Sequence, residues 1–566
     1  MRWNILFLGM CLIAPLYAQS DLTGRILDKV VCEEDAAQSY ALYVPSSYAN
    51  TKKWPVIFCF DASARGRIPV ERLQAAAEKY GYLVAGSLTS RNGPWAANTA
   101  AARAMVKDVS AHFSIDVARI YTTGVSGGAR VATTFGLSGL SKGVIACSAG
   151  FPMPDKIPTQ IPFVYFGTAG VEDFNYWEMR RLDQDLSRRK AVHRTVIFKG
   201  GHEWASAALM TEAVEWLELQ AMKTGSLPKN DDFIRSQFQS RVAAMTGQAG
   251  IDRWCALQSL NADFSGLVEV GALEKEENEL RNSRVVKAAL KKEVAAEISE
   301  SELVNELGEV AMESTNRKRT FAAELRRKAD AADDSIERAG VRRALAGYLF
   351  STRETIRRHF EEQEYGEAAA VLELSSLLKP DDKQCFYDLA RAHGFNGDKK
   401  RALGALRSAV AAGLRDIERI QSEPAFAKLA HEADFQRFIL DLQNPPPGSI
   451  MEMPVMRVSA ALASVELRVF SQPNMDSAER PLSFLRVENV RPDTAAARAG
   501  IARGMEIVAI QDIRIRGLSE DELGAVMQQP VQNEIVLIVR EPPRRGEWEI
   551  RISLRKSSRE LSPGNN

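Results

Sequence analysis

A serine flanked by glycines offers the chemistry of a nucleophile in the segment Gly124-Val125-Ser126-Gly127-Gly128. Residues 119–123 before it read as a short strand, and residues 129–135 after it read as a helix. A serine at such a turn is held in a strained backbone conformation with its hydroxyl clear of the sheet. The flanking glycines let the strand and the helix approach without a Cβ clash. Because a serine hydroxyl alone is a weak nucleophile, the segment predicts a nearby base and an acid that orients that base.

The base is sought among few candidates, because the chain has only 6 histidines. His112 precedes the serine, whereas this kind of turn is followed in the chain by the acid and then by the histidine. His193 begins a predicted strand, which places it at the wrong end of a parallel sheet. His202 follows the last predicted strand, on a loop that two glycines make adaptable. We therefore predict His202 as the base, the alternative being a structural loop histidine.

The acid is expected in the loop of residues 168–176, which follows a predicted buried strand. Asp173 is the predicted acid, and Glu172 beside it is the alternative. The acid would fix the tautomer of the imidazole and stabilise the imidazolium that forms.

An oxyanion intermediate needs two backbone donors. The amide of Gly127 is predicted to be one, and that of Ala62, on the loop after an upstream buried strand, to be the second. Asp61 and Arg65 either shape substrate binding or form a structural ion pair. The segment Asn92-Gly93-Pro94-Trp95 follows another predicted strand and is expected to line the cleft, the alternative being a packed Trp95.

These residues need a scaffold, and residues 24–222 alternate strand and helix patterns. This alternation predicts a mainly parallel sheet with helices on both faces, and with the reactive residues at the carboxyl ends of strands. The first predicted strand is expected at an edge. The predicted strands are 39–45, 54–60, 82–86, 119–123, 143–148, 162–167 and 194–198.

Residues 24–222 resemble secreted α/β-hydrolases of the esterase and polyhydroxybutyrate-depolymerase-like group. The motifs that carry the resemblance are Tyr43-Val44-Pro45, residues 116–121, the turn at Ser126 and Gly201-His202. The resemblance implies hydrolysis of a small or polymeric carboxylic ester through an acyl-enzyme. It implies no metal and no cofactor, and it leaves the acyl group open.

The composition sets limits on the other possibilities. A chain of 566 residues is too long for one core, so several domains are expected. Lys and Arg number 73, as do Asp and Glu, which argues against a dedicated surface for nucleic acid or anionic membrane. The cysteines form no C-x-x-C pair or Cys/His cluster, so neither a zinc site nor a disulfide framework is indicated.

The N-terminus has the pattern of a secretory signal peptide, residues 1–18. Arg2 is followed by an apolar run that is shorter than a membrane span, and Ala18 would be the last residue before the cut. The sequence therefore predicts a secreted or periplasmic protein with no stable membrane span.

Helical patterns occupy residues 228–443. The part from 228 to 350 is rich in charge and is expected to be a solvated helical array. Ala368 and Ala402 are 34 residues apart, and the residues around Ala402 resemble a tetratricopeptide repeat, so 351–443 are predicted to hold such repeats. A plain helical hairpin is the alternative. The matching residues are Phe386, Leu389, Ala390, Ala402, Leu406 and Ala409.

A stiff proline-rich linker, 444–454, separates this part from a region of strands. Residues 455–556 resemble a PDZ domain through the motif at 490–496 and the segments 499–501 and 504–507. Family members usually carry Gly-Asp where this chain has Gly504-Met505, and no carboxylate-binding loop is legible. Residues 557–566 are expected to be a disordered tail.

The expected protein is thus multidomain: an α/β-hydrolase, a helical and tetratricopeptide-like part, and a small PDZ-like domain. Its expected activity is that of a serine esterase, with a protein or peptide partner for residues 351–556. A peptidase of the same fold, or a non-catalytic scaffold with a vestigial hydrolase fold, are the alternatives.

Overall fold

The structure is a computed structural model of the whole chain. The predicted signal peptide, linker and tail, and the start of the PDZ-like region, lie outside the residues that it describes. The chain divides into two compact units, residues 1–380 and 381–566, which are described separately. The described residues are 22–153, 156–331, 335–443, 462, 465–471, 482–491, 494–510, 513–516, 518–527, 534–541 and 547–553.

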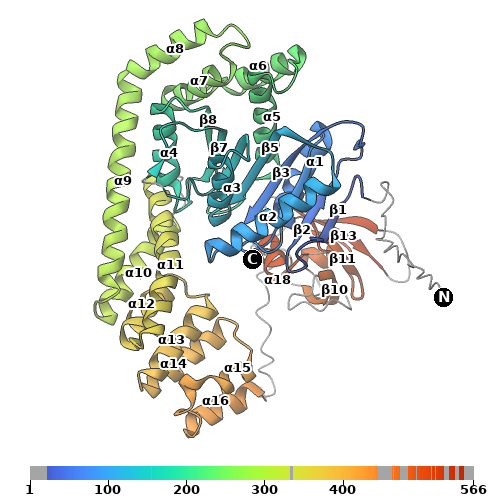
Figure 1. The fold of residues 1–566 in the computed structure, drawn as a ribbon. Coiled ribbons are helices and arrows are strands. Elements are labelled where there is room, and N and C mark those ends of the chain that lie inside the picture. The colour runs from blue at the N-terminus through green and yellow to red at the C-terminus, as the bar shows by residue number, and fades with distance from the viewer. Residues whose placement is uncertain are drawn as a thin grey trace, which may run out of the picture. The chain divides into compact units, whose positions relative to one another are not determined.

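The first unit begins with an eight-stranded sheet in the order β1-β2-β4-β3-β5-β6-β7-β8 (Figure 1). Strand β2 runs antiparallel to both β1 and β4, and all the other neighbours are parallel. The predicted mainly parallel sheet is confirmed. The strands are β1 (Ile26–Val31), β2 (Ser39–Tyr43), β3 (Trp54–Asp61), β4 (Leu83–Ser87), β5 (Ile115–Val125), β6 (Gly143–Cys147), β7 (Val164–Gly170) and β8 (His193–Phe198).

The prediction that residues 39–45 form an edge strand is wrong. All five residues of β2 are buried, because β1 pairs with its outer side. Strand β1 was not predicted, since its half-exposed pattern lacks the apolar run of an interior strand.

Five helices cover the two faces of the sheet. Helices α2, α3 and α4 pack their apolar side chains on one face, and α1 and α5 pack on the other. The central strands read as continuous apolar runs because both of their faces are buried. The helices are α1 (Arg67–Tyr80), α2 (Trp95–His112), α3 (Gly127–Leu137), α4 (Tyr176–Arg188) and α5 (Ala207–Thr224). Residues 22–224 are called the sheet region below.

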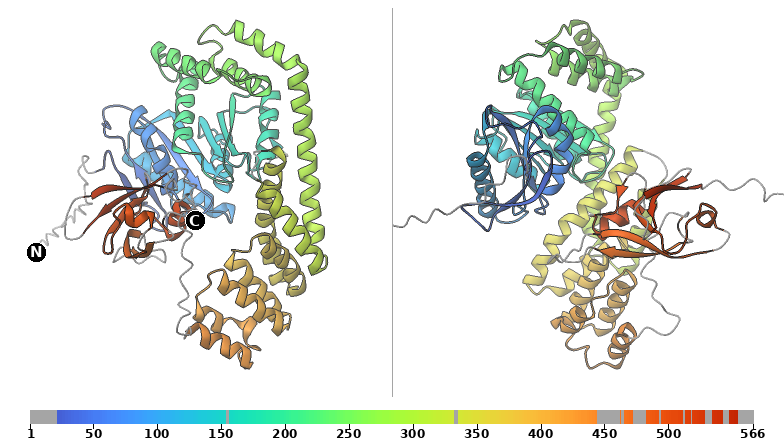
Figure 2. Two further views of the ribbon diagram at one scale, coloured as in Figure 1. Left: turned by 180° about the vertical axis from the view of Figure 1, so that it is seen from behind. Right: turned by 90° about the vertical axis from the view of Figure 1, so that its right-hand side faces the viewer.

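The rest of the first unit, residues 231–378, is called the helical region. Serine N-caps begin three of its helices, at Ser283, Ser314 and Ser335. Helix α9 runs along the side of the sheet region on which α4 and β8 lie (Figures 1 and 2). Helix α11 continues through position 350, where the sequence suggested a boundary. The helices are α6 (Asp231–Ala244), α7 (Gly250–Phe264), α8 (Gly271–Asn282), α9 (Arg284–Val310), α10 (Thr315–Ala329), α11 (Ile336–Glu361) and α12 (Tyr365–Leu378).

The second unit opens with helices and ends with a small antiparallel sheet. Ala390, Ala402, Leu406 and Ala409 of the repeat-like pattern are fully buried in α13 and α14. The described strands form the order β14-β13-β11-β10-β9, with β12 beside β11. The elements are α13 (Lys383–Phe395), α14 (Lys399–Ala411), α15 (Ile417–Ser422), η3 (Pro424–Phe426), α16 (Ala433–Gln443), β9 (Val465–Ser471), β10 (Leu482–Val490), α17 (Ala495–Arg498), β11 (Glu506–Ile510), β12 (Ile513–Arg514), α18 (Glu520–Met527), β13 (Glu534–Arg540) and β14 (Glu547–Ser553).

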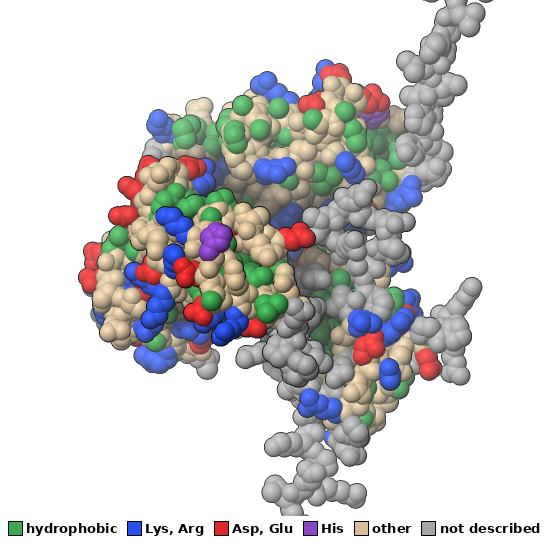
Figure 3. Space-filling model, turned by 90° about the horizontal axis from the view of Figure 1, so that it is seen from below, with side chains coloured by type: hydrophobic (Ala, Val, Ile, Leu, Met, Phe, Trp, Pro, Cys, Tyr) green, Lys and Arg blue, Asp and Glu red, His purple; other side chains and the backbone are tan. Residues whose placement is uncertain are grey.

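Surface charge is mixed. On the face drawn in Figure 3, positive and negative side chains are interspersed among the described residues. Within the described part of the chain, no helix is both long enough and apolar enough to cross a membrane.

Candidate active site

Ser126 lies in the tight turn between β5 and α3. Its φ of 55° and ψ of −125° put a non-glycine residue at positive φ, a strained conformation that persists only where the surroundings fix it. The amide of Ser126 donates to the carbonyl of Cys147, 2.9 Å away at the end of β6. The structure therefore has the strained strand-to-helix turn that the glycine–serine spacing predicts.

The glycines around Ser126 are required by close backbone contacts. A Cβ on Gly124 would collide with the carbonyl group of Gly128, and a Cβ on Gly128 would collide with the carbonyl oxygen of Phe60 in β3. Strand β5, helix α3 and strand β3 thus meet without side chains between them. No other residue type fits either position in this arrangement.

Asp173 and His202 are brought together although 29 residues separate them. Asp173 lies in the β7–α4 loop, residues 171–175, and His202 follows β8. The Nδ1 atom of His202 donates to Oδ1 of Asp173 over 2.8 Å. Because a carboxylate only accepts, this bond puts the imidazole proton on Nδ1 and leaves the lone pair on Nε2 free to act as a base.

The loops after β7 and β8 are joined along their backbones. The amides of Val171 and Glu172 donate to the carbonyls of Phe198 and Gly200 over 2.8 and 2.9 Å. Asp173 is fully buried, and its Oδ1 also accepts from the amide of Asn175. The position of the carboxylate is therefore set by main-chain contacts at the end of the sheet.

The end of β6 connects this pair to the serine turn. Ser148 donates its hydroxyl to the carbonyl of Glu203, 3.0 Å away, and its own carbonyl accepts from the side chain of Asn175. The preceding residue, Cys147, accepts from the Ser126 amide. Ser126, Asp173 and His202 thus lie at one edge of the sheet, held by neighbouring strand ends.

The Nε2 atom of His202 is buried and has no hydrogen-bond partner in the described part of the chain. The Ser126 hydroxyl is therefore not bonded to it in this structure. Catalytic hydrogen bonds in ligand-free structures are often open and close only around a substrate. The free Nε2 is the atom that would accept the serine proton.

Glu172, the other acid that the sequence left open, points to the helical region. It pairs with Arg342 of α11 at 2.8 Å and with Arg338 at 3.5 Å. Of the two adjacent carboxylates, Asp173 is the one bonded to the imidazole.

The predicted oxyanion donors lie at the same sheet edge. Gly127 is the first residue of α3, where amide groups lack partners within the helix. Asp61 is paired with Val125 in the parallel register of β3 and β5, which places Ala62 level with Ser126. The carbonyl of Ala62 accepts from the amide of Asn92 over 2.8 Å.

Asn92 was predicted only as part of a segment that could line the cleft. A Cβ at position 127 would collide with Oδ1 of Asn92, so the Asn92 carboxamide lies directly over Gly127. Asn92 thus touches both predicted donor segments, one through its amide and the other through its side chain.

For Asp61 the structure supports the structural alternative. Its carboxylate is 0% exposed and accepts from the Ser63 amide, the Arg65 guanidinium and the indole of Trp204. Burial raises the pKa of Asp61, but the hydrogen bonds from Arg65, Trp204 and Ser63 outweigh it and hold the pKa below its ordinary value. Both oxygens are used, so Asp61 ties the loop after β3 to the loop after β8.

Trp95 begins α2 and is 48% exposed. The alternative of a tryptophan packed into the domain is therefore wrong. Its ring is available to a ligand beside the exposed segment that contains Asn92.

His193 and His112 lie away from the site, as the strand pattern predicts for His193 and the order of residues along the chain predicts for His112. His193 is at the amino end of β8 and pairs with Asp183 of α4 at 3.4 Å. His112 is the last residue of α2 and contacts Glu33.

Two aromatic side chains beside His202 were missed from the sequence. Phe174 stacks on the imidazole with ring centres 3.9 Å apart, and Phe350 of α11 stacks on Phe174 at 4.8 Å. Phe174 could have been noticed because it follows Asp173 directly. Nothing in the sequence around Phe350 marks it.

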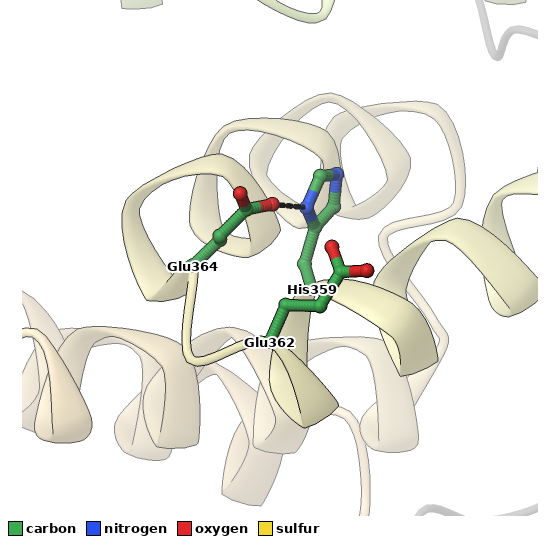
Figure 4. A group of neighbouring side chains, drawn as sticks. All are labelled: His359, Glu362 and Glu364. Atoms are coloured by element: carbon green, nitrogen blue, oxygen red, sulfur yellow. Dashed lines mark hydrogen bonds and ion pairs between the residues drawn. The ribbon is translucent and has the colours of Figure 1, made fainter.

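One set of described side chains is close enough to share a metal ion: His359, Glu362 and Glu364, at the end of α11 (Figure 4). The Nδ1 atom of His359 already bonds Glu364 over 2.7 Å, and both carboxylates are exposed. Exposed acidic groups are common without an ion, and we assign this set no metal.

No family model matches the chain, and no curated protein matches it. Three of the solved structures found are FphF, a Staphylococcus aureus fluorophosphonate-binding serine hydrolase, a ferulic acid esterase, and a Pyrobaculum calidifontis esterase. Their identities to this chain are 12%, 15% and 12%, with TM-scores of 0.27, 0.28 and 0.29. The matches cover 32%, 34% and 36% of this chain and 92%, 97% and 86% of theirs. Such scores decide nothing about activity.

The strand order and the strained turn after β5 define the fold of the sheet region. The N-terminal sheet is α/β-hydrolase-like.

Proposed function

We propose that the chain is a serine hydrolase that cleaves carboxylic esters. The observation that carries the proposal is the 2.8 Å hydrogen bond from His202 Nδ1 to the buried Asp173, at the sheet edge where Ser126 occupies its strained turn. A nucleophile, a base and an orienting acid in this chain order are the parts needed for acyl transfer.

In the proposed reaction, the Ser126 oxygen attacks the ester carbonyl carbon while Nε2 of His202 takes the hydroxyl proton. The carbonyl oxygen becomes an oxyanion, which the amides of Gly127 and Ala62 would stabilise. Collapse of this intermediate breaks the bond to the alcohol oxygen, and His202 returns the proton to that leaving oxygen. Water then attacks the acyl-serine carbonyl carbon while His202 takes a proton from the water. The bond to the serine oxygen breaks, His202 returns the proton to that oxygen, and the acid is released.

Asp173 would act through His202 alone. Its bond to Nδ1 keeps the imidazole in the tautomer whose Nε2 can accept a proton, and its charge stabilises the imidazolium. Trp95 and Asn92 are proposed to contact the substrate, since both are exposed and the side chain of Asn92 lies over Gly127, next to Ser126.

We further propose that residues 1–18 direct the protein to a secreted or periplasmic location. Residues 351–556, with their tetratricopeptide-like and PDZ-like patterns, are proposed to bind a protein or peptide partner.

The test is labelling of the purified mature protein with a fluorophosphonate probe, with the labelled peptide located by mass spectrometry. Ser126→Ala should abolish labelling, and His202→Ala should reduce it strongly. Ser138→Ala is the matched control, because Ser138 is exposed at the opposite end of the same helix α3. Turnover of p-nitrophenyl esters, compared with the matching anilides, then separates an esterase from a peptidase.

A folded wild-type protein that takes no label would contradict the proposal. It would favour the alternative of a scaffold with a vestigial hydrolase fold, and binding partners of residues 351–556 would then be the next target.

A further inference from the structure

Helix α11 contacts the β7–α4 loop at the two residues that precede Asp173. Arg343 donates from Nη1 to the carbonyl of Val171 over 2.6 Å. The adjacent Arg342 donates to both oxygens of Glu172, at 2.8 and 3.1 Å. These contacts hold the loop just ahead of the carboxylate that bonds His202.

Arg343 is itself fixed in a buried network. It is 2% exposed, and its guanidinium donates to Glu300 of α9 from Nη2 at 2.7 Å and from Nε at 3.0 Å. The indole of Trp177, in the first turn of α4, donates to the same carboxylate over 2.8 Å. The guanidinium also lies over the ring of Tyr176. Arg343 therefore holds the loop on one side and the helix that follows it on the other.

Two turns further along the same face of α11, Phe350 contacts His202 through the ring of Phe174. Positions seven apart lie on one side of a helix, so Arg343 and Phe350 face the sheet region together. Phe350 stacks on Phe174, and Phe174 stacks on the imidazole of His202. Gly347 leaves the room for this stack, because a Cβ there would stand 3.3 Å from the Cβ of Phe174.

We propose that α11 is part of the catalytic unit, and that Arg343 and Phe350 are positioning residues for Asp173 and His202. The inference rests on the proposed hydrolase function. Arg343 acts through the carbonyl of Val171, and Phe350 acts through Phe174. The helical region is then a component of the enzyme and not an appendage that could be removed from it.

The test compares three substitutions on α11. Phe350→Ala removes the stack at a side chain that is 45% exposed, so the protein should fold. Phe350→Tyr keeps the ring and is the conservative variant. Arg357→Ala is the matched control, because Arg357 is on the same helix and its ion pairs, among the residues that the structure describes, are with the exposed Glu354 and Glu361.

Two readouts are needed. With p-nitrophenyl acetate, whose small acyl group makes little contact beyond the reacting atoms, Phe350→Ala should lower kcat roughly tenfold while KM changes less than about twofold. Phe350→Tyr should restore kcat, and Arg357→Ala should leave it unchanged. Hydrogen–deuterium exchange, which needs no turnover, should quicken in peptides covering residues 165–177 in Phe350→Ala only.

An unchanged kcat or an unchanged exchange rate in a folded Phe350→Ala protein would overturn the inference. A wild-type protein without label or turnover would instead refute the proposed function. In that case the exchange measurement alone still decides whether α11 holds the loop. Arg343→Lys, which retains one donor for Val171, serves as a second variant and should lower kcat less than Arg343→Met does.

Discussion

The sheet region and the helical region position their side chains by different means. In the sheet region, backbone atoms set the geometry: glycines 124 and 128 allow strands and helix to touch, and paired loops fix Asp173. In the helical region, long side chains make the contacts: Arg343 and Phe350 extend from α11 to the β7–α4 loop of the sheet region. Backbone contacts leave a signature in the sequence, in the form of glycines and strand ends. Side chains on a charged helix leave none, although they touch the same site.

The largest expected effect on activity comes from comparing two neighbouring carboxylates. Asp173 bonds His202 within the sheet region, whereas Glu172 pairs with α11 of the helical region. Asp173→Asn should lower the rate of ester hydrolysis by about 10⁴-fold, because the amide no longer selects the imidazole tautomer. Glu172→Gln, which loses the charge that pairs with Arg342 and Arg338, should lower the rate by less than about tenfold. Steady-state kinetics measures both. Equal losses in the two variants would show that the choice of Asp173 as the acid is wrong.

The next effect tests how firmly the helical region is attached. Glu300→Gln breaks the buried pair with Arg343 and should lower the free energy of unfolding by about 3–5 kcal/mol, because a buried guanidinium loses its counter-charge. Glu297→Gln, one turn away on α9, removes a pair with the exposed Arg181 and should cost less than about 1 kcal/mol. Denaturant titration measures both, and similar losses would mean that the buried network does not hold the regions together.

Two glycine substitutions compare the close backbone contacts of the sheet region with the open surface of a helix in the helical region, through their effects on stability. Gly128→Ala should destabilise the protein by about 3 kcal/mol, because the added methyl would overlap the fixed carbonyl of Phe60. Gly308→Ala on α9 meets nothing within 4 Å and should stabilise the protein by about 0.5–1 kcal/mol. Thermal melts suffice for this pair, and a tolerated Gly128→Ala would contradict the close packing of the turn.

The smallest effect depends on pH. Burial lowers the pKa of His193, but the hydrogen bonds to Asp183 and to the Ala191 carbonyl outweigh it and leave the pKa raised. Burial raises the pKa of Asp183, and the bond to His193 outweighs it and leaves that pKa lowered. The stability due to His193 is therefore complete below its unfolded pKa and is lost as the pH rises through the folded pKa.

The contribution of Asp183 is present above its unfolded pKa and is lost as the pH falls through its folded one. His193→Gln should thus cost most between about pH 4 and 6.5, by about 1 kcal/mol, and less at pH 9. His112→Gln is the control: His112 contacts Glu33 and Asp108, but its own side chain is 43% exposed, so the cost should be smaller. A pH-independent cost for His193→Gln would show that the pair is not charged.

The sequence could predict the parallel sheet, the turn at Ser126 and the meeting of residues 173 and 202, because all three follow from where strands end. It favoured Asp173 but could not exclude Glu172, since the partner that binds Glu172 is an arginine 170 residues further on. Strand β1 and the interior position of β2 were missed because a half-exposed strand lacks an apolar run. Phe350 was missed because helical periodicity shows that a residue faces a neighbour but not which neighbour.

The long separation in sequence between the β7–α4 loop and helix α11, which contacts it, has a consequence for protein synthesis. Glu172 and Arg342 are 170 residues apart, so at roughly 5–20 residues per second the loop waits about 10–30 s for helix α11 to be made. A nascent chain thus holds Ser126, Asp173 and His202 before it holds the helix that steadies them. A chain cut short between His202 and Phe350 would keep every reactive side chain but lose the contacts of α11, so it should hydrolyse esters more slowly than the full chain.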